Sequence, residues 1–331
     1  MIIVDNCKTY TQSLPLTVYL FIMGMFFEYV ERLSKMDSSP DWNRVWHNTV
    51  LENQPEIGKN LFTYILDNAL NFVKDKNGNA LEIGCFPGRF IDYVGSYGME
   101  ISGIDTYDRV HELGPWLKSR GRRVGQFLNL DMKTINDAFP SKFDFVFSLG
   151  LIEHFEDFCQ VLEYHSNCVK NNGILLVGAP NFASIVQRSL HKSFDYKNIQ
   201  GHVLSAMYPE LWNVYLTSLG FDVLYCGHFG GFGFWSETPS HDRDVLHMQN
   251  LIPQLAPTFN ELNSQLKSAE SAYNIIIARK FIATNPDADI LKNMRTICLR
   301  LATSLSEKDE KMSNILSNTI KTLINFNFEK N

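Results

Sequence analysis

Residues 81–88 form an apolar run that passes directly into a glycine turn, and they read Leu81-Glu82-Ile83-Gly84-Cys85-Phe86-Pro87-Gly88. The short apolar segment 80–83 is typical of a strand. A glycine that follows a strand allows a tight turn in which a ligand can approach the backbone closely. The free N–H groups at the start of the next helix then face that ligand. The stretch therefore predicts a strand, a turn and a helix with a ligand at the turn.

On both sides of this turn, short apolar runs alternate with segments of helical periodicity. Helices are predicted at 56–73, 109–120, 155–170 and 209–219, with Asn171-Asn172-Gly173 ending the third. Further strands are predicted at 101–104, 124–128, 143–149, 174–178, 221–226 and 273–278. This alternation predicts an α/β fold with a parallel sheet covered by helices on both faces. Strands without period-two alternation fit burial on both sides.

Composition indicates an ordinary globular chain. The 331 residues are 45% hydrophobic and 20% charged, with a net charge of −6. This acidic balance argues against broad nucleic-acid binding, which depends on clustered Lys and Arg, so no nucleic-acid partner is predicted. The six cysteines contain no C-x-x-C pair and no zinc-finger spacing. Scattered cysteines of this kind predict a reducing, cytoplasmic location.

The chain divides into three predicted parts. Residues 1–55 form a helical lead-in, residues 56–281 the ligand-binding domain, and residues 285–331 a helical C-terminal extension. An insertion at about 227–271 interrupts the domain, and its second half has a helical period. In the extension, apolar positions at helical spacing flank the polar run Ser306-Glu307-Lys308-Asp309. This pattern predicts a helical hairpin that packs on the domain or on a second subunit of a homodimer.

Residues 14–27 (LPLTVYLFIMGMFF) are an apolar run of fourteen residues. A spanning helix needs about 20 apolar residues, so the run is short for a membrane span. A signal peptide needs a basic n-region and a small-residue cleavage site, which this run lacks. A buried N-terminal helix or a dimer contact is the favoured interpretation, and peripheral membrane contact is the second. A third is that translation naturally begins at Met36.

Acidic residues lie at the ends of three successive predicted strands. Glu82 precedes the first turn and suits a ligand with a cationic amino group. Asp105 ends the second strand, where a carboxylate can accept hydrogen bonds from the two hydroxyls of a ribose. Asp131 follows the third strand, where it can accept a hydrogen bond from an adenine amino group while Met132 covers the ring edge. Three acids placed in this way are more specific than one.

A dinucleotide-binding site would use the same architecture. Its fingerprint is G-x-G-x-x-G, whereas Phe86 and Arg89 stand at the second and third glycine positions here. The bulky Phe86 and Pro87 hinder the approach of a pyrophosphate to the backbone, and the fingerprint leaves Glu82 unexplained. The other alternative is a tight turn that binds nothing, in which case the three acids are a coincidence.

Together these motifs resemble class I S-adenosylmethionine-dependent methyltransferases over about residues 61–279. Residues 81–88 resemble the first motif of that family, 103–105 its ribose motif and 131–132 its adenine motif, and 143–148 and 172–177 resemble its fourth- and fifth-strand motifs. The resemblance implies a Rossmann-like fold with a seven-stranded, mostly parallel sheet whose last hairpin contains a reversed strand. It also implies S-adenosylmethionine as the cofactor. The implied cofactor-binding residues are Glu82, Gly84, Cys85, Phe86, Gly88, Asp105, Thr106, Asp131, Met132 and Leu149. Many members have glycine where Phe86 stands, which predicts a stiffer loop.

The segment Gly150-Leu151-Ile152-Glu153-His154-Phe155 is similar to the Glu-His segment of methyltransferases that act on small hydroxylated molecules, such as those of quinone biosynthesis. Some of those enzymes have a further glutamate three residues before this pair, and the three residues ligate a divalent metal. Gly150 stands at that position, so no metal is predicted. The catalytic candidates are His154, which has an unperturbed pKa near 6.5 and suits a general base, with Glu153 and His202. Alternatively, His154 orders the loop or touches the cofactor.

The acceptor is predicted to bind to polar and aromatic groups further along the chain. The candidates are Asn181, His191, Asp195, Tyr196 and Trp235. The alternative is that residues 191–202 form a polar connecting loop and residues 228–235 a surface loop instead of a lid. Segments 85–90, 150–155 and 180–182 look like those of bacterial methyltransferases of sugar or surface-polysaccharide pathways, which implies a saccharide hydroxyl as the acceptor.

Three functions compete on this basis. The first is O-methylation of a small molecule, with a sugar or polysaccharide precursor favoured. The second is N- or C-methylation of a natural product with the same cofactor site. The third is a non-catalytic S-adenosylmethionine-binding scaffold whose C-terminal helices engage a partner. The intact set of three acids argues against the scaffold, because such a protein does not need them.

Overall fold

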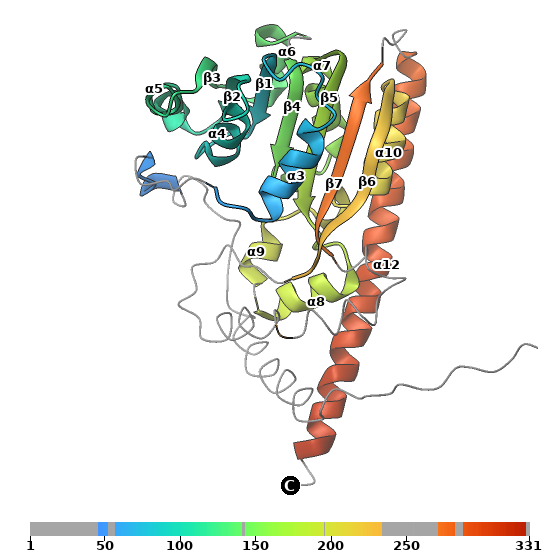
Figure 1. The fold of residues 1–331 in the computed structure, drawn as a ribbon. Coiled ribbons are helices and arrows are strands. Elements are labelled where there is room, and N and C mark those ends of the chain that lie inside the picture. The colour runs from blue at the N-terminus through green and yellow to red at the C-terminus, as the bar shows by residue number, and fades with distance from the viewer. Residues whose placement is uncertain are drawn as a thin grey trace, which may run out of the picture.

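The computed structural model describes residues 46–51, 57–140, 143–194, 196–233, 254, 271–281 and 287–328. The apolar run 14–27, Met36 and most of the predicted insertion lie outside these residues. Figure 1 shows a central sheet flanked by helices, with the long helix α12 (Ala288–Phe328) running along one side. Within the described ranges, no helix combines the length and the hydrophobicity of a membrane span.

A seven-stranded sheet forms the centre of the molecule. Its strands are β1 (Asn79–Ile83), β2 (Glu100–Asp105), β3 (Arg123–Asn129), β4 (Phe143–Leu149), β5 (Val169–Pro180), β6 (Phe221–Phe232) and β7 (Ser271–Lys280). They are ordered β3-β2-β1-β4-β5-β7-β6. Strand β7 is antiparallel to both of its neighbours, and all other pairs are parallel. This confirms the predicted Rossmann-like methyltransferase fold, including the reversed strand.

Helices cover both faces of the sheet. The α-helices besides α12 are α3 (Leu61–Leu70), α4 (Arg89–Gly95), α5 (Leu113–Ser119), α6 (Ile135–Ala138), α7 (Phe158–Cys168), α8 (Ile185–Phe194), α9 (Tyr196–Gln200) and α10 (Pro209–Ser218). Short 3-10 helices are η2 (Asp108–Glu112), η3 (Met132–Thr134), η4 (Ile152–His154) and η5 (Leu204–Ala206).

Successive strand residues enter opposite hydrophobic cores. In β4, Val146 joins the core that includes α7 and α10, whereas Phe145 and Phe147 join the core that includes α3, α4 and α5. Strand residues alternate in this way because neighbouring side chains point to opposite faces of a sheet. Both faces of the central strands are buried, which explains why a strand such as β4 is mostly apolar, whereas the edge strand β3 is exposed or half-buried along its length.

Helix boundaries differ from the predicted ones where capping or proline intervenes. Helix α3 begins only at Leu61 because Asn60 caps it, accepting from the N–H groups of Phe62 and Thr63. The predicted helix at 109–120 is η2 followed by α5, since Pro115 has no N–H and is tolerated only in a first helical turn.

The predicted helix at 155–170 is also shorter than expected. Helix α7 begins after Asp157, whose Oδ1 accepts from the N–H of Gln160, and it ends at Cys168. The following Asn171-Asn172-Gly173 was expected to end the helix, but it lies inside β5. Asn172 has a φ of 64° there, a conformation that asparagine adopts more readily than most residues.

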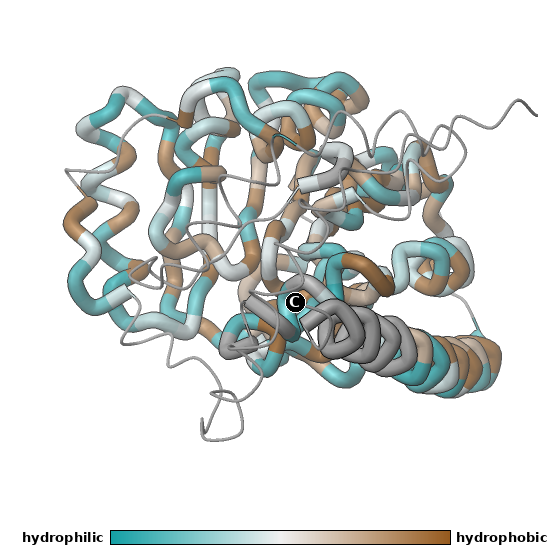
Figure 2. The backbone as a smooth tube through the Cα atoms, turned by 90° about the horizontal axis from the view of Figure 1, so that it is seen from below, coloured by the Kyte–Doolittle hydropathy of each residue, from teal (hydrophilic) through white to brown (hydrophobic). Residues whose placement is uncertain are grey.

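The C-terminal extension is one helix, and the predicted hairpin is wrong. Helix α12 continues through Ser306-Glu307-Lys308-Asp309 because this polar run contains no proline or glycine. The two ends of the run contact the domain, while Glu307 and Lys308 are exposed. Arg188 of α8 donates to the carbonyl of Ser306 over 2.9 Å, and Tyr208 donates to Asp309 over 2.7 Å. Figure 2 shows hydrophobic and hydrophilic residues alternating along the described part of α12.

Strand β6 is longer than predicted and takes up the start of the proposed lid. It continues past the expected end at Cys226 to Phe232, pairing with β7 as far as Ser271. Residues 228–232 are therefore part of the sheet and not a separate loop.

The order of the strands places a crevice at the centre of the sheet. The connections reverse direction between β1 and β4, and ligands of open α/β sheets bind beyond the carboxyl ends of strands at such a point. Ile83, Leu149 and Pro180 at the ends of β1, β4 and β5 all line a cavity there.

Candidate functional site

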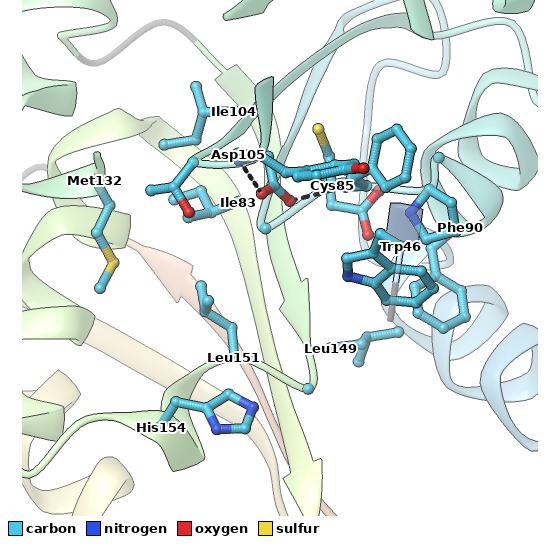
Figure 3. Close-up of a pocket in the computed structure, with 18 of the residues that line it drawn as sticks. Trp46, Ile83, Cys85, Phe90, Ile104, Asp105, Met132, Leu149, Leu151 and His154 are labelled. Carbon is cyan, nitrogen blue, oxygen red and sulfur yellow. Dashed lines mark hydrogen bonds between the residues drawn. The ribbon is translucent and has the colours of Figure 1, made fainter. Parts of the chain in front are cut away.

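A cavity of about 740 Å³ lies beyond the carboxyl ends of the central strands. This volume is within the range of small-molecule sites, roughly 300–1,000 Å³. The ten residues predicted to contact the cofactor all line it: Glu82, Gly84, Cys85, Phe86, Gly88, Asp105, Thr106, Asp131, Met132 and Leu149. Figure 3 shows Asp105 and His154 at opposite ends of the cavity, with Leu151 between them.

The turn after β1 needs its two glycines. Gly84 and Gly88 have φ angles of +76° and +88°, which other residues rarely adopt. A Cβ atom at Gly88 would also lie 2.8 Å from Leu113. The carbonyl of Ile104 accepts hydrogen bonds from the N–H groups of Gly84 and Cys85 over 2.9 and 3.1 Å, which ties the turn to β2. The sequence pattern therefore reflects backbone geometry.

Asp105 joins two loops at the edge of the cavity. Its Oδ2 accepts from the N–H of Phe86 over 3.0 Å, and its Oδ1 accepts from the N–H of Tyr107 over 2.9 Å. Burial raises the pKa of Asp105, and hydrogen bonds from the backbone of Phe86, Tyr107 and Thr106 oppose that shift. Each carboxylate oxygen has a second lone pair, so both can still accept from a ligand.

Glu82 is a buried acid in the cavity wall, with 3% of its surface exposed. Burial raises its pKa well above the ordinary value, the backbone N–H of Ile91 lowers it, and the nearby charge of Asp105 raises it further. Among the described residues, no group donates a hydrogen bond to Glu82 Oε2. A buried carboxylate oxygen without a donor is costly, so this atom is a natural partner for a cationic ligand group.

Asp131 and Met132 form another edge of the cavity. Asp131 is largely exposed, and its Oδ1 accepts from the N–H of Lys133 over 3.0 Å. Met132 is buried and presents an apolar surface beside it. Both residues lie where the adenine contacts were predicted, and the contacts themselves stay predictions.

An aromatic wall was missed by the sequence reasoning. Phe86 packs edge-on against Trp46 and Tyr107, with ring centroids 6.1 and 4.8 Å apart. Arg109 lies over the Phe86 ring at 5.8 Å and donates to the carbonyls of His47 and Thr49 over 3.3 and 2.9 Å. This arrangement explains Phe86 in place of glycine, because the ring fills space between the turn and residues 46–51. The motif signal begins only at β1, so Trp46 could not have been found from it.

We expect Arg109→Ala to weaken S-adenosylmethionine binding by roughly 5- to 10-fold, because losing about one net hydrogen bond and a cation–π contact releases Trp46 from the cavity wall. Isothermal titration calorimetry measures this. Arg123→Ala is the matched control, since Arg123 also donates to two carbonyls, those of Asn77 and Gly98, away from the cavity. Equal affinity in the two variants would contradict the assigned role of Arg109.

The three predicted catalytic residues are brought together. Glu153 and His154 line the cavity, and the His202 ring centroid lies 4.8 Å from that of His154. Glu153 is buried, and its carbonyl accepts from the N–H of Val203 over 2.6 Å, which fixes η4 to the segment that carries His202. Burial lowers the pKa of His154, and a hydrogen bond to the Gly201 carbonyl partly offsets this.

Two of the five predicted acceptor-binding residues, Asn181 and His191, have described side chains, and neither lines the cavity. Asn181 is buried behind the wall and donates to the carbonyl of Ser271 over 2.8 Å, and it does not line the cavity. His191 is fully buried in α8 against the ring of Phe182, with centroids 4.0 Å apart, so its direct contact with an acceptor is not supported. Asp195 and Trp235 lie outside the described residues, as does the side chain of Tyr196.

The comparisons with known proteins agree with this architecture. Residues 57–226, more than half of the chain, match a family model described as a methyltransferase domain. The chain belongs to this methyltransferase domain family. A comparison with curated proteins finds no match.

Solved structures of the same fold are distant in sequence. An S-adenosylmethionine-dependent methyltransferase from Archaeoglobus fulgidus is 21% identical, with a TM-score of 0.45, covering 66% of this chain and 92% of that one. The [4+2]-cyclase SpnF is 14% identical, with a TM-score of 0.46 and coverage of 75% and 99%. The YcgJ protein from Bacillus subtilis is 13% identical, with a TM-score of 0.43 and coverage of 67% and 100%.

Proposed function

We propose that this chain is an S-adenosylmethionine-dependent O-methyltransferase that methylates a hydroxyl of a sugar or polysaccharide precursor. The observation that carries the proposal is that the two ends of the cavity differ in their chemical groups. Asp105 lies at one end of the cavity, which Glu82 and Asp131 also line, and His154 lies at the other end, next to Glu153 in η4.

The cofactor end suits S-adenosylmethionine group by group. Glu82 Oε2, which accepts no hydrogen bond from the described residues, is the partner for the amino group of the cofactor. Asp105 retains lone pairs for the ribose hydroxyls, and Asp131 and Met132 offer an acceptor and an apolar edge for adenine. The cofactor supplies an activated methyl group on a sulfonium.

The acceptor end needs little chemistry of its own. In-line methyl transfer requires alignment of the acceptor oxygen with the methyl carbon and removal of the hydroxyl proton. Glu153 and His154 are the groups at that end of the cavity that can accept a proton. An amine acceptor would not require such a group if it arrived unprotonated, and this difference favours a hydroxyl.

Aromatic side chains support a saccharide as the acceptor. Besides Phe86, the cavity is lined by Trp46, Phe62, Phe90, Tyr107, Phe155 and Tyr273. Aromatic faces offer apolar surface to the C–H groups of a sugar ring while polar tips bond its hydroxyls. A flat phenolic acceptor would use the same surface, so the experiment includes both.

The test combines ligand binding with turnover. We expect S-adenosylmethionine to raise the Tm of the full chain, because a ligand that binds only the native state stabilises it. We then expect formation of S-adenosylhomocysteine with nucleotide sugars or free saccharides in a panel that also contains phenols and amines. Mass spectrometry identifies the methylated atom. Turnover of amines alone would overturn O-methylation, and no Tm shift in folded protein would overturn the cofactor assignment.

A further inference from the structure

Glu153, His154 and His202 form a compact cluster at the acceptor end of the cavity. Each offers one ligand atom, a carboxylate oxygen or a ring nitrogen, and these atoms lie within 4.8 Å of one another. Glu153 and His154 come from η4, and His202 follows α9. The third ligand position expected from the local motif is Gly150, yet the fold brings His202 to the pair from 48 residues further along the chain.

Backbone carbonyls orient both imidazoles. His154 Nδ1 is 3.0 Å from the carbonyl oxygen of Gly201, and His202 Nδ1 is 2.5 Å from that of Asn198. A carbonyl only accepts hydrogen bonds, so each Nδ1 carries the proton and each Nε2 presents its lone pair. Histidines that ligate metals are held in this tautomer by the same kind of hydrogen bond.

Packing fixes the His202 ring as well. Phe182 lies edge-on to His202, with centroids 5.0 Å apart, and His191 packs on Phe182 at 4.0 Å. The buried His191 thus supports the cluster from behind.

We infer that Glu153, His154 and His202 bind a divalent transition-metal ion of the Zn²⁺ type. Two imidazole nitrogens and one carboxylate oxygen are the donor set of open, three-ligand zinc sites and of related iron sites, whereas Mg²⁺ and Ca²⁺ prefer oxygen ligands. Ligand atoms around Zn²⁺ at 2.0–2.2 Å lie roughly 3.4 Å apart, so the side chains need to close by about an ångström.

The position of the metal site, at the acceptor end of the cavity, gives the ion a role in activating the acceptor hydroxyl. Glu153 and His154 line the cavity, and His154 lies at the end away from Asp105, so an ion held by them would lie beside the acceptor end. A bound ion lowers the pKa of an oxygen that coordinates it. With the ion in place, Glu153 and His154 promote loss of the hydroxyl proton as ligands of the ion and do not accept the proton themselves. This role for the acceptor hydroxyl rests on the proposed function, but the binding of the ion does not.

The test is calorimetric titration of the full chain, first treated with a chelator, with Zn²⁺, Mn²⁺ and Mg²⁺ separately. We expect one Zn²⁺ per chain at this site, and Mg²⁺ at least roughly 100-fold weaker because the donors include two nitrogens. Glu153→Gln and His202→Asn should each weaken this Zn²⁺ binding by roughly 100-fold or more. The matched control is His111→Asn, an exposed histidine outside the cavity lining, which should leave it unchanged.

A cooperative thermal transition at a Tm close to that of the wild type, measured without metal or cofactor, shows that each variant is folded. A second variant, His202→Gln, is used if His202→Asn fails that test. Zn²⁺ binding that is equal in the wild type and in folded Glu153 and His202 variants would overturn the inference, as would the absence of Zn²⁺ binding. Those outcomes leave cofactor binding and methyl transfer standing. Zn²⁺ binding without any response to S-adenosylmethionine would instead overturn the proposed function alone.

Discussion

Asp105→Ala is expected to weaken S-adenosylmethionine binding by at least roughly 100-fold, the largest loss for any single cofactor-site residue. Two hydrogen bonds between a carboxylate and the ribose hydroxyls are worth about 1.5–3 kcal/mol each. The substitution also removes the acceptor for the N–H groups of Phe86 and Tyr107, so the first turn keeps only its backbone hydrogen bonds to Ile104 of β2. Calorimetric titration of the purified variant with S-adenosylmethionine measures the change.

The control for this experiment is Asp137→Ala, which removes an exposed acid of α6 outside the cavity lining. It should bind the cofactor like the wild type. Asp105→Asn separates the two roles of Asp105, because the amide oxygen still accepts one backbone N–H. Wild-type affinity in the alanine variant would remove Asp105 from the cofactor site.

Glu82→Gln is expected to change cofactor binding and folding in opposite directions. Loss of the ion pair with the cofactor amino group should weaken binding by roughly 10- to 100-fold, from about 1.5–3 kcal/mol for a hydrogen bond between charged groups. The cofactor-free protein should be equally or more stable, because the variant no longer buries an ionisable carboxyl. Glutamine keeps an oxygen for the Ile91 N–H. Tm values with and without cofactor test both parts, and lower stability with unchanged binding would contradict the assignment.

The raised pKa of Glu82 also gives a pH dependence with a defined sign. Its contribution to the free energy of unfolding is complete below the unfolded pKa, about 4.3, and is lost as pH rises through the elevated folded pKa. Cofactor affinity has the opposite pH dependence, because the cationic amino group of the cofactor needs the ionised carboxylate of Glu82. Binding therefore weakens as pH falls through the elevated pKa of Glu82. Asp105 faces Glu82, and its raised pKa acts in the same direction. Glu82→Gln should flatten both profiles, which urea unfolding and calorimetry across pH would measure.

That the ten predicted cofactor residues line one cavity could be predicted because the information is local. Gly84 and Gly88 are required by backbone angles, and Asp105 directly follows the residues that form β2. In a parallel sheet, strand ends converge at one edge whatever the loops do, so acids at three strand ends come together. The residue types and their spacing were therefore sufficient.

The acceptor half depends on contacts between distant segments. His202 reaches His154 through the turn after α9, and nothing in the local pattern of either segment specifies that approach. His191 is polar in sequence yet packs fully buried on Phe182. Trp46 precedes every motif and is held in the cavity wall by Arg109, 63 residues later. The periodicity of apolar residues predicts a helix or strand, but it does not predict which other segments pack against it. These contacts therefore could not be predicted.

The single long C-terminal helix α12 could not be predicted for the same reason, because its role depends on contacts with a distant part of the chain. Those contacts lie around the polar run at residues 306–309. Arg188 is fully buried in α8, and its charge is compensated by the Ser306 carbonyl and by Glu310, both on α12. A buried cation that loses such partners is strongly destabilising. Helix α8 also carries His191, which packs on the ring of Phe182. Phe182 in turn packs edge-on against His202. The extension is thus an external brace for the side chains behind the Glu153–His154–His202 cluster, while the turn after β1 is built without it.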